Sequence, residues 1–252
     1  MRIFTPAVWW ATHVLLGALL YRGLRARLFR EYPVFYGYAV YVLCSSLVLF
    51  RLSLASRQIY TFAYWIAEFI SALCGIGIIW EIYDVTFAAY AGVRRAARGL
   101  ITALVLAVTV AAVVDMERHP IPVLFPTTVE VEQNLRFIEA ILLAAILSTV
   151  IYYRVPLGRN VRSLLYGYAL YIGTVVITLT LQSFWGAAFL IWWTALQPFA
   201  YLVTLVIWCA GLWQRAAKPA PSPALQRDYE WMSQQTAIAL AHLRKRVIDT
   251  MR

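Results

Sequence analysis

This sequence has few charged residues for its length. Charged residues make up 13% of its 252 residues and the mean hydropathy is +0.70, whereas soluble domains carry about 25% charged residues. Between Arg162 and Arg215 there is no Asp, Glu, Lys or Arg. An uncharged run of that length holds two membrane spans of about 20 residues each, folded back at the polar pair Gln182-Ser183. The composition excludes a soluble domain and predicts a protein of the lipid bilayer.

Motifs for catalysis and metal binding are also lacking. The three cysteines, Cys44, Cys74 and Cys209, all fall inside apolar stretches, which gives neither a disulfide framework nor a metal-type spacing. His119 and His242 have no second ligand at metal spacing. The sequence contains no Gly-rich phosphate loop, no nucleophile elbow and no HExxH motif. We therefore expect no enzymatic activity, no metal and no cofactor.

What the sequence does contain is seven apolar stretches. Backbone groups in lipid must pair within their own segment, and no period-two alternation indicates a barrel, so each stretch should be a helix. We predict an all-α membrane fold, a seven-transmembrane-helix bundle. The longest external connection, 115–134, holds three prolines and should be extended. The expected spans are 7–21, 34–52, 60–83, 99–115, 135–153, 163–182 and 188–212.

Basic residues alternate between the two sides of these spans. Seventeen of the 22 Lys and Arg residues fall in the first, third and fifth connections and the C-terminal tail, and five fall on the opposite side. Short cytoplasmic loops carry the excess of positive charge. We therefore predict a multi-pass protein of a bacterial inner membrane, N-terminus out and C-terminus in. The net charge of +10 then reflects topology and contact with anionic lipid at the cytoplasmic face, and we expect no nucleic-acid partner.

A hexapeptide occurs twice. Residues 36–41 (YGYAVY) open the second span and residues 166–171 (YGYALY) open the sixth. The spans that follow also correspond, since Trp65 and Trp80 are as far apart as Trp193 and Trp208. Either Tyr, Gly and Trp coincide by chance at interfaces, or the chain is duplicated. Duplication predicts repeat one at 7–90, a linker helix at 99–115 and a parallel repeat two at 135–213, within a transmembrane domain of residues 1–214.

This 3+1+3 plan with the N-terminus outside resembles the layout of SWEET-type sugar transporters and PQ-loop proteins, and more distantly that of seven-helix opsins. The resemblance covers residues 1–214 in topology only, because the Pro-Gln pair is absent from the first and fifth spans. In transporters with parallel repeats the binding site lies between the copies. The only lysines, Lys218 and Lys245, lie in the tail, so no span can form a retinal Schiff base.

Polar residues inside the spans are candidates for a ligand or proton site, because ionisable groups are costly at membrane depth. Glu68 lies roughly 10 Å below the outer surface at 1.5 Å per residue. His13, Glu139, Thr178 and Gln197 lie near the same level. Together they predict a cavity for a cation, an amine or a hydroxylated solute, or a proton relay through Glu68 and His13.

Structural roles compete with that prediction. His13 is also explained, and better, as a residue that forms a hydrogen bond between helices. Glu139 follows Arg136 by three residues, so the two can form an ion pair near the headgroups. Glu68 has no Lys or Arg within one helical turn, so we expect its carboxyl to face the bundle interior and find a donor there or take up a proton. Glu68 is therefore the centre of the hypothesis.

A second charged group lies at the cytoplasmic end of the third span. Glu81 and Asp84 share one helix face, and Arg94, Arg95 and Arg98 follow in the next connection. These residues predict an ion-pair lock, either purely structural or rearranging between two states.

The tail consists of a Pro/Ala linker at 215–224 and a segment at 225–252 with apolar residues at three- and four-residue steps. That spacing predicts a cytoplasmic amphipathic helix, which lies on anionic lipid or packs on a partner protein or a second copy of the chain. The leading functional hypothesis is a non-enzymatic sensor or scaffold that couples an intramembrane polar site to a cytoplasmic partner. The alternative is a small-solute or proton-coupled transporter. Alternating access usually needs broken or hinged helices in corresponding positions of the two halves, and Pro198 is the only proline deep in a span, which counts against this alternative.

Overall fold

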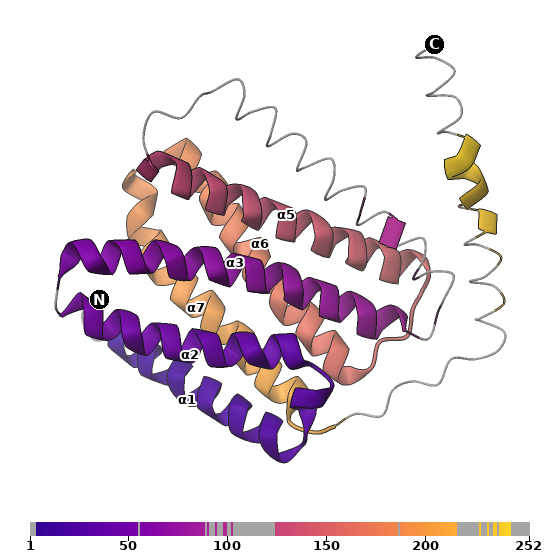
Figure 1. Ribbon diagram of the computed structural model, residues 1–252, viewed down its shortest axis with the longest axis horizontal. Coiled ribbons are helices and arrows are strands. Elements are labelled where there is room, and N and C mark those ends of the chain that lie inside the picture. Colours follow the sequence, from indigo (N-terminus) through magenta and orange to yellow (C-terminus); the bar gives the residue numbers. More distant parts are fainter. Residues whose placement is uncertain are drawn as a thin grey trace, which may run out of the picture.

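The computed structural model describes residues 4–54, 56–88, 124–185 and 187–215, with isolated positions between 90 and 102 and between 227 and 242. The described residues form helices joined by short turns. No strand occurs within these ranges. Figure 1 shows the helices side by side. They are α1 (Phe4–Arg25), the short 3₁₀ helix η1 (Leu28–Arg30), α2 (Pro33–Ser53), α3 (Arg57–Phe87), α5 (Leu124–Tyr152), α6 (Arg159–Trp185) and α7 (Ala187–Leu212).

Among the described residues, four helices are long and apolar enough to cross a membrane: Pro33–Ser53, Arg57–Phe87, Leu135–Tyr152 and Arg159–Thr178. A shorter apolar helix covers Leu196–Leu212. Many large apolar side chains on these helices face outward, among them Leu47, Phe62, Leu73 and Ile177. An apolar outer surface of this kind suits lipid and not water. The structure is thus compatible with an integral membrane protein. The prediction at 99–115 lies outside the described residues, apart from residues 99 and 102.

One expectation about the connections was wrong. Residues 124–134, which we expected to be extended, are the first turns of α5. Pro126 is the third residue of that helix, where its missing N–H costs no hydrogen bond because the first-turn N–H groups have no partner within the helix. Three prolines in a connection therefore do not exclude a helix that has one of them in its first turn. Residues 115–123 lie outside the described residues.

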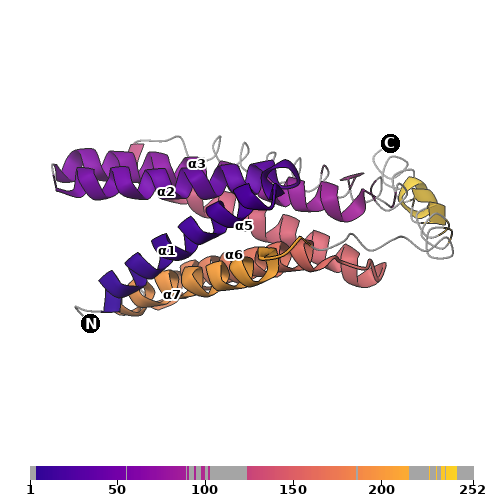
Figure 2. The same cartoon turned by 90° about the horizontal axis from the view of Figure 1, so that it is seen from below.

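The described helices form a closed ring, because each packs on the next along the chain and α1 packs on α7. Within this ring α3 packs on α5, the next described helix, and α3 also contacts α6 across the ring. Figure 2 shows α2 and α3 in one layer and α6 and α7 in the other, with α1 crossing diagonally between the layers. In Figure 1 the connections α1–α2 and α5–α6 lie at one end of the bundle, and α2–α3 and α6–α7 at the opposite end.

Close helix contacts rely on glycine at two places near the bundle centre. A Cβ on Gly167 of α6 would collide with the indole of Trp208 in α7, a side chain that is only 2% exposed. A Cβ on Gly75 of α3 would collide with the Tyr168 hydroxyl and the Glu139 carboxylate. Gly75 therefore lets α3 approach α5 and α6 closely enough for polar groups on all three helices to meet.

Candidate intramembrane polar site

Arg136 of α5 is the centre of the polar groups inside the bundle. Its side chain is 2% exposed. Its Nη2 donates to Oε2 of Glu68 in α3 at 3.1 Å, and its Nη1 donates to Oε2 of Glu139, one turn along α5, at 3.3 Å. Glu139 is fully buried, whereas the Glu68 side chain is 26% exposed. One guanidinium thus joins two carboxylates from two helices, in a geometry that its planar set of donors allows.

Tyrosines of both hexapeptides surround this ion pair. The Tyr168 hydroxyl donates to Oε2 of Glu139 at 3.2 Å, which ties α6 to α5. The ring of Tyr171 lies 6.0 Å from the Arg136 guanidinium carbon, within the range of a cation–π contact. Tyr38 of α2 lines one cavity with Glu68 and Tyr171, and its hydroxyl is 3.4 Å from that of Ser71. The two copies of the hexapeptide therefore supply side chains to one cluster.

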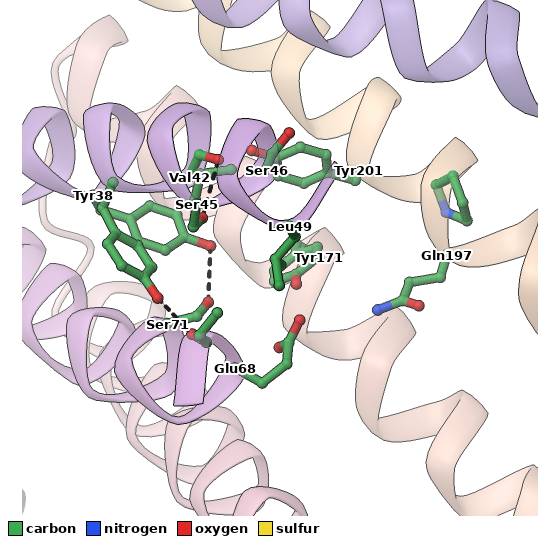
Figure 3. Close-up of a pocket in the computed structure, with 13 residues that line it drawn as sticks. Tyr38, Val42, Ser45, Ser46, Leu49, Glu68, Ser71, Tyr171, Gln197 and Tyr201 are labelled. Atoms are coloured by element: carbon green, nitrogen blue, oxygen red, sulfur yellow. Dashed lines mark hydrogen bonds between the residues drawn. The ribbon is translucent and has the colours of Figure 1, made fainter. Parts of the chain in front are cut away.

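Glu68 also lines a cavity of about 250 Å³ between α2, α3, α6 and α7. Figure 3 shows Glu68 and Gln197 directed into this space from α3 and α7. The Tyr201 hydroxyl is buried at its edge and has no hydrogen-bond partner among the described residues. The lining combines four tyrosines with serines, one carboxylate and one amide: Tyr38, Tyr41, Tyr171, Tyr201, Ser45, Ser46, Ser71, Glu68 and Gln197.

A second cavity of about 250 Å³ adjoins the first and contains His13. Its walls are mainly apolar and include Val8, Trp9 and Leu16 of α1. His13 Nδ1 lies 2.7 Å from the Trp9 carbonyl and must donate to it, because a carbonyl only accepts. His13 Nε2 lies 2.5 Å from Oγ of Ser46 in α2. Four residues line both cavities: Val42, Ser46, Pro198 and Tyr201.

The structure thus groups most, but not all, of the residues predicted for the site. Glu68 and Gln197 share one cavity, His13 lies in the adjoining one, and Glu139 reaches Glu68 through Arg136. Thr178 is fully buried, but its hydroxyl donates to the carbonyls of Thr174 and Val175 in its own helix, and it lines neither cavity. Its contacts are therefore those of a helix residue and give it no part in the cavity.

The expected i,i+3 pair of Arg136 with Glu139 does form, and both side chains are buried in the bundle. The expectation that this pair lies near the headgroups stays a prediction. The donor that Glu68 requires is Arg136, 68 positions away in sequence. A single-helix spacing argument finds the first contact and cannot find the second. The tyrosines were also missed as site residues, although their repetition in the two hexapeptides was visible.

The predicted lock at the other end of α3 divides into two features. The Arg94 guanidinium forms an ion pair with Asp84, and the Arg98 guanidinium carbon lies 5.9 Å from the centre of the Trp80 ring. Arg95 lies outside the described residues. Glu81 does something else: its two carboxylate oxygens accept the backbone N–H groups of Val34 and Phe35, at 2.8 and 2.9 Å.

Glu81 therefore caps the N-terminus of α2 from a neighbouring helix, in place of the predicted ion pair. The residue preceding that helix, Tyr32, provides no side-chain cap, and Pro33 has no N–H to donate. A carboxylate is favourable there because the first N–H groups of a helix lack partners and carry partial positive charge. Burial, together with the negative charges of Glu31 and Glu81, raises the pKa of Tyr32 to about 12, so Tyr32 stays neutral beside this carboxylate at physiological pH.

Chemically, the site offers a carboxylate, an amide, hydroxyls and aromatic faces to a ligand of modest size. Within the described ranges no three His, Cys, Asp or Glu side chains gather closely enough to hold a metal ion. Comparison with known proteins adds nothing further, because no protein-family description, curated protein or solved structure matches the chain.

Proposed function

We propose that this chain is a seven-span integral membrane protein that holds a small polar solute at Glu68 and couples occupancy of that site to a cytoplasmic partner through residues 225–252. The observation that carries the proposal is the Glu68 cavity. The Glu68 carboxylate is held in place by a buried arginine and lies in a tyrosine-lined space of about 250 Å³ that also holds serines and an amide. Convergent polar groups in a concave site are the usual mark of ligand binding.

Contacts at one end of the bundle support the orientation with the N-terminus out. Arg22 donates to the Trp213 carbonyl at 2.5 Å, and Arg159 donates to the Gln214 carbonyl at 3.4 Å. Arg215 pairs with Glu31 at 2.5 Å. The first connection, the fifth connection and the start of the tail therefore meet at one end, which gathers basic charge as a cytoplasmic face does.

The helix pairing supports the duplication. If α1, α2 and α3 correspond to α5, α6 and α7, then the contact of α1 with α7 corresponds to that of α5 with α3, and both occur. Arg27 and Arg154 also match, because each has a left-handed backbone two residues after α1 or α5 ends. The copies have diverged, since Trp80 is 46% exposed and Trp208 only 2%. We expect the copies to be parallel, about an axis near the membrane normal.

A coupling role is favoured by the stiffness of the site. Arg136 joins α3 to α5, and Tyr168 joins α6 to the same cluster through Glu139. A solute that binds Glu68 acts on all three helices at once. In the tail, residues 237–242 are helical and exposed, with Ile238 and Leu240 open to a partner or to lipid. We propose no catalytic role for the chain itself, so the response passes to a separate protein.

A transporter of 3+1+3 architecture is the second candidate. The lack of a second proline deep in a span counts against it, but the position of Pro198 beside both cavities favours it. This proline lies inside α7 and lines both cavities. A proline within a helix removes one backbone hydrogen bond and permits a kink there. Movement of α7 at Pro198 would change the shape of both cavities together.

The proposal is tested with Glu68→Gln. Glutamine keeps an acceptor for Arg136, which also keeps its bond to Glu139, so the free energy of unfolding should fall by only about 1 kcal/mol. The assay uses purified protein in nanodiscs with a fluorophore at Gln234→Cys, after replacement of Cys44, Cys74 and Cys209. The label emission is followed while a panel of small amines, polyols and sugars is added.

We expect at least one class of solute to change the tail signal in wild type and not in Glu68→Gln. Thr61→Ala is the control and should respond as wild type does, because Thr61 lines neither cavity and its hydroxyl bonds the Arg57 carbonyl of its own helix. Uptake of the same panel into proteoliposomes separates the two candidates, because a sensor binds without flux and a transporter shows flux that Glu68→Gln abolishes. A fully responsive Glu68→Gln protein removes Glu68 from the site and leaves the proposal without a centre.

A further inference from the structure

The lining of the Glu68 cavity identifies a class of ligand. Four tyrosines face one space together with a carboxylate, and two of them, Tyr171 and Tyr201, meet edge to face with ring centres 5.7 Å apart. Aromatic faces carry negative electrostatic potential and attract cations within about 6 Å, most strongly where water is excluded. Arg136 already uses the ring of Tyr171 in this way. Aromatic rings combined with a carboxylate favour an organic cation over a neutral solute.

The polar groups left over in the cavity also match an ammonium. Arg136 takes Oε2 of Glu68, and Oε1 accepts no hydrogen bond from any described residue. The Tyr201 hydroxyl, buried and likewise without a partner in the described part of the chain, lines the same space. Both are oxygen acceptors, as is the amide oxygen of Gln197. A primary ammonium group has three N–H donors, which matches the number of these acceptors.

The adjoining cavity indicates what the rest of the ligand is. Its lining is predominantly apolar, with Trp9 and Leu16 among its walls, and it shares Val42, Ser46, Pro198 and Tyr201 with the first cavity. A ligand held by its charged group at Glu68 can therefore direct an apolar substituent past Tyr201 toward α1. The two cavities differ in chemistry and adjoin, as the two ends of an amphipathic amine require.

We propose that the paired cavities bind a primary organic ammonium with an apolar or aromatic substituent, its charged end at Glu68 among the tyrosines and its apolar end against Trp9 and Leu16. This inference rests on the proposed function in that it takes the Glu68 cavity as the ligand site, and it adds the chemical class of the solute. Recognition uses the charge, the N–H donors and the apolar group together.

The test is calorimetric binding to the full chain in nanodiscs. The probe is 2-phenylethylammonium, compared with the uncharged 2-phenylethanol and with ethylammonium, which lacks the apolar group. The charged aromatic probe should bind at least about tenfold more tightly than 2-phenylethanol, since a desolvated cation–π contact or a charge-assisted hydrogen bond contributes that much. It should also bind at least about tenfold more tightly than ethylammonium, since burial of the phenyl ring in the second cavity contributes as much. Equal affinity for 2-phenylethanol, or no binding of 2-phenylethylammonium, overturns the proposal.

Variants separate the contributions of the binding groups. Glu68→Gln should weaken the charged probe by at least about tenfold, as the loss of a charge-assisted bond does. Tyr201→Phe keeps the ring and should cost less affinity than Tyr201→Leu, which removes it. Leu16→Phe fills only the second cavity and should weaken 2-phenylethylammonium while leaving ethylammonium unchanged. Each protein's melting temperature is measured first. If Tyr201→Leu does not fold, Tyr201→Phe and the comparison of the two ammonium probes on Leu16→Phe still test the proposal.

Failure of this inference is distinguishable from failure of the proposed function. A tail response or flux that depends on Glu68 but occurs with neutral solutes, without preference for the ammonium, sinks the ligand class alone. Selective binding of 2-phenylethylammonium with neither a tail response nor flux supports the ligand class and sinks the coupling and transport roles. Both results decide the ligand class, because calorimetry compares 2-phenylethylammonium directly with 2-phenylethanol.

Discussion

Replacing Arg136 with methionine should be among the most damaging substitutions in the bundle. The variant keeps the length of an apolar stem but leaves Glu139, which is fully buried, and Glu68 without the guanidinium that joins them. Removing one partner of a buried ion pair costs about 3–5 kcal/mol, because the remaining charge stays desolvated without its counter-ion. Burial of Arg136 to 2% exposure places this pair in that class.

Arg215→Met is the matched control. Arg215 also pairs with a glutamate, Glu31 at 2.5 Å, but its side chain is 63% exposed. Exposed pairs contribute only about 0–1 kcal/mol because water screens the charges. The same substitution at two arginines, each in an ion pair, therefore has very different expected effects, and burial is what separates them.

The measurement is reversible unfolding in mixed micelles, followed by tryptophan fluorescence as a denaturing detergent is added. A triple variant, Glu68→Gln with Arg136→Met and Glu139→Gln, should recover much of the lost stability, since no unpaired charge remains. If Arg136→Met is no less stable than Arg215→Met, the buried ion pair does not hold the helices together and the reasoning fails.

Three further predictions test the topology and the packing. A fluorescent reporter that is inactive outside the cytoplasm, fused after Arg252, should give signal, and a dark but fully expressed fusion would overturn the orientation. Gly75→Ala should lower the unfolding free energy by about 1–3 kcal/mol through overpacking, whereas Gly37→Ala, where a Cβ meets nothing within 4 Å, should raise it by up to about 1 kcal/mol. Equal effects of the two would refute the close contact. Glu81→Leu should cost about 2 kcal/mol or more by stranding two N–H groups of α2, and Asp84→Asn less than about 1 kcal/mol, both measured by the same detergent unfolding.

Much of the architecture was predictable because it depends on local composition. Apolar stretches without charge give helices, and the expected ranges agree with α2, α3 and α6 to within several residues at most ends. The start of α5 was not predictable from proline content, since the effect of Pro126 depends on whether it lies in the first turn. The seven-span count, the orientation and the duplication stay predictions.

The candidate site was predictable only in part. Glu68 was identified as a buried carboxylate in need of a donor, which follows from the cost of charge in lipid. That the donor is Arg136 depends on how α3 packs against α5, and Gly75 permits that packing. Glu81 shows the same limit, since its partners are backbone N–H groups of α2 and not the arginines nearest in sequence.

By itself the sequence determined the helical class, predicted a bilayer setting and identified the polar groups inside the apolar stretches, because each of these follows from residue type and from spacing within one segment. Only the tertiary structure decided which polar groups meet, that His13 and Glu68 lie in separate but adjoining cavities, and that Tyr168 and Tyr171 contact the Arg136–Glu139 pair. The reason is physical. Hydrogen bonds and ion pairs act over about 3 Å, and distances of that size between helices are set by side-chain packing and not by spacing along the chain.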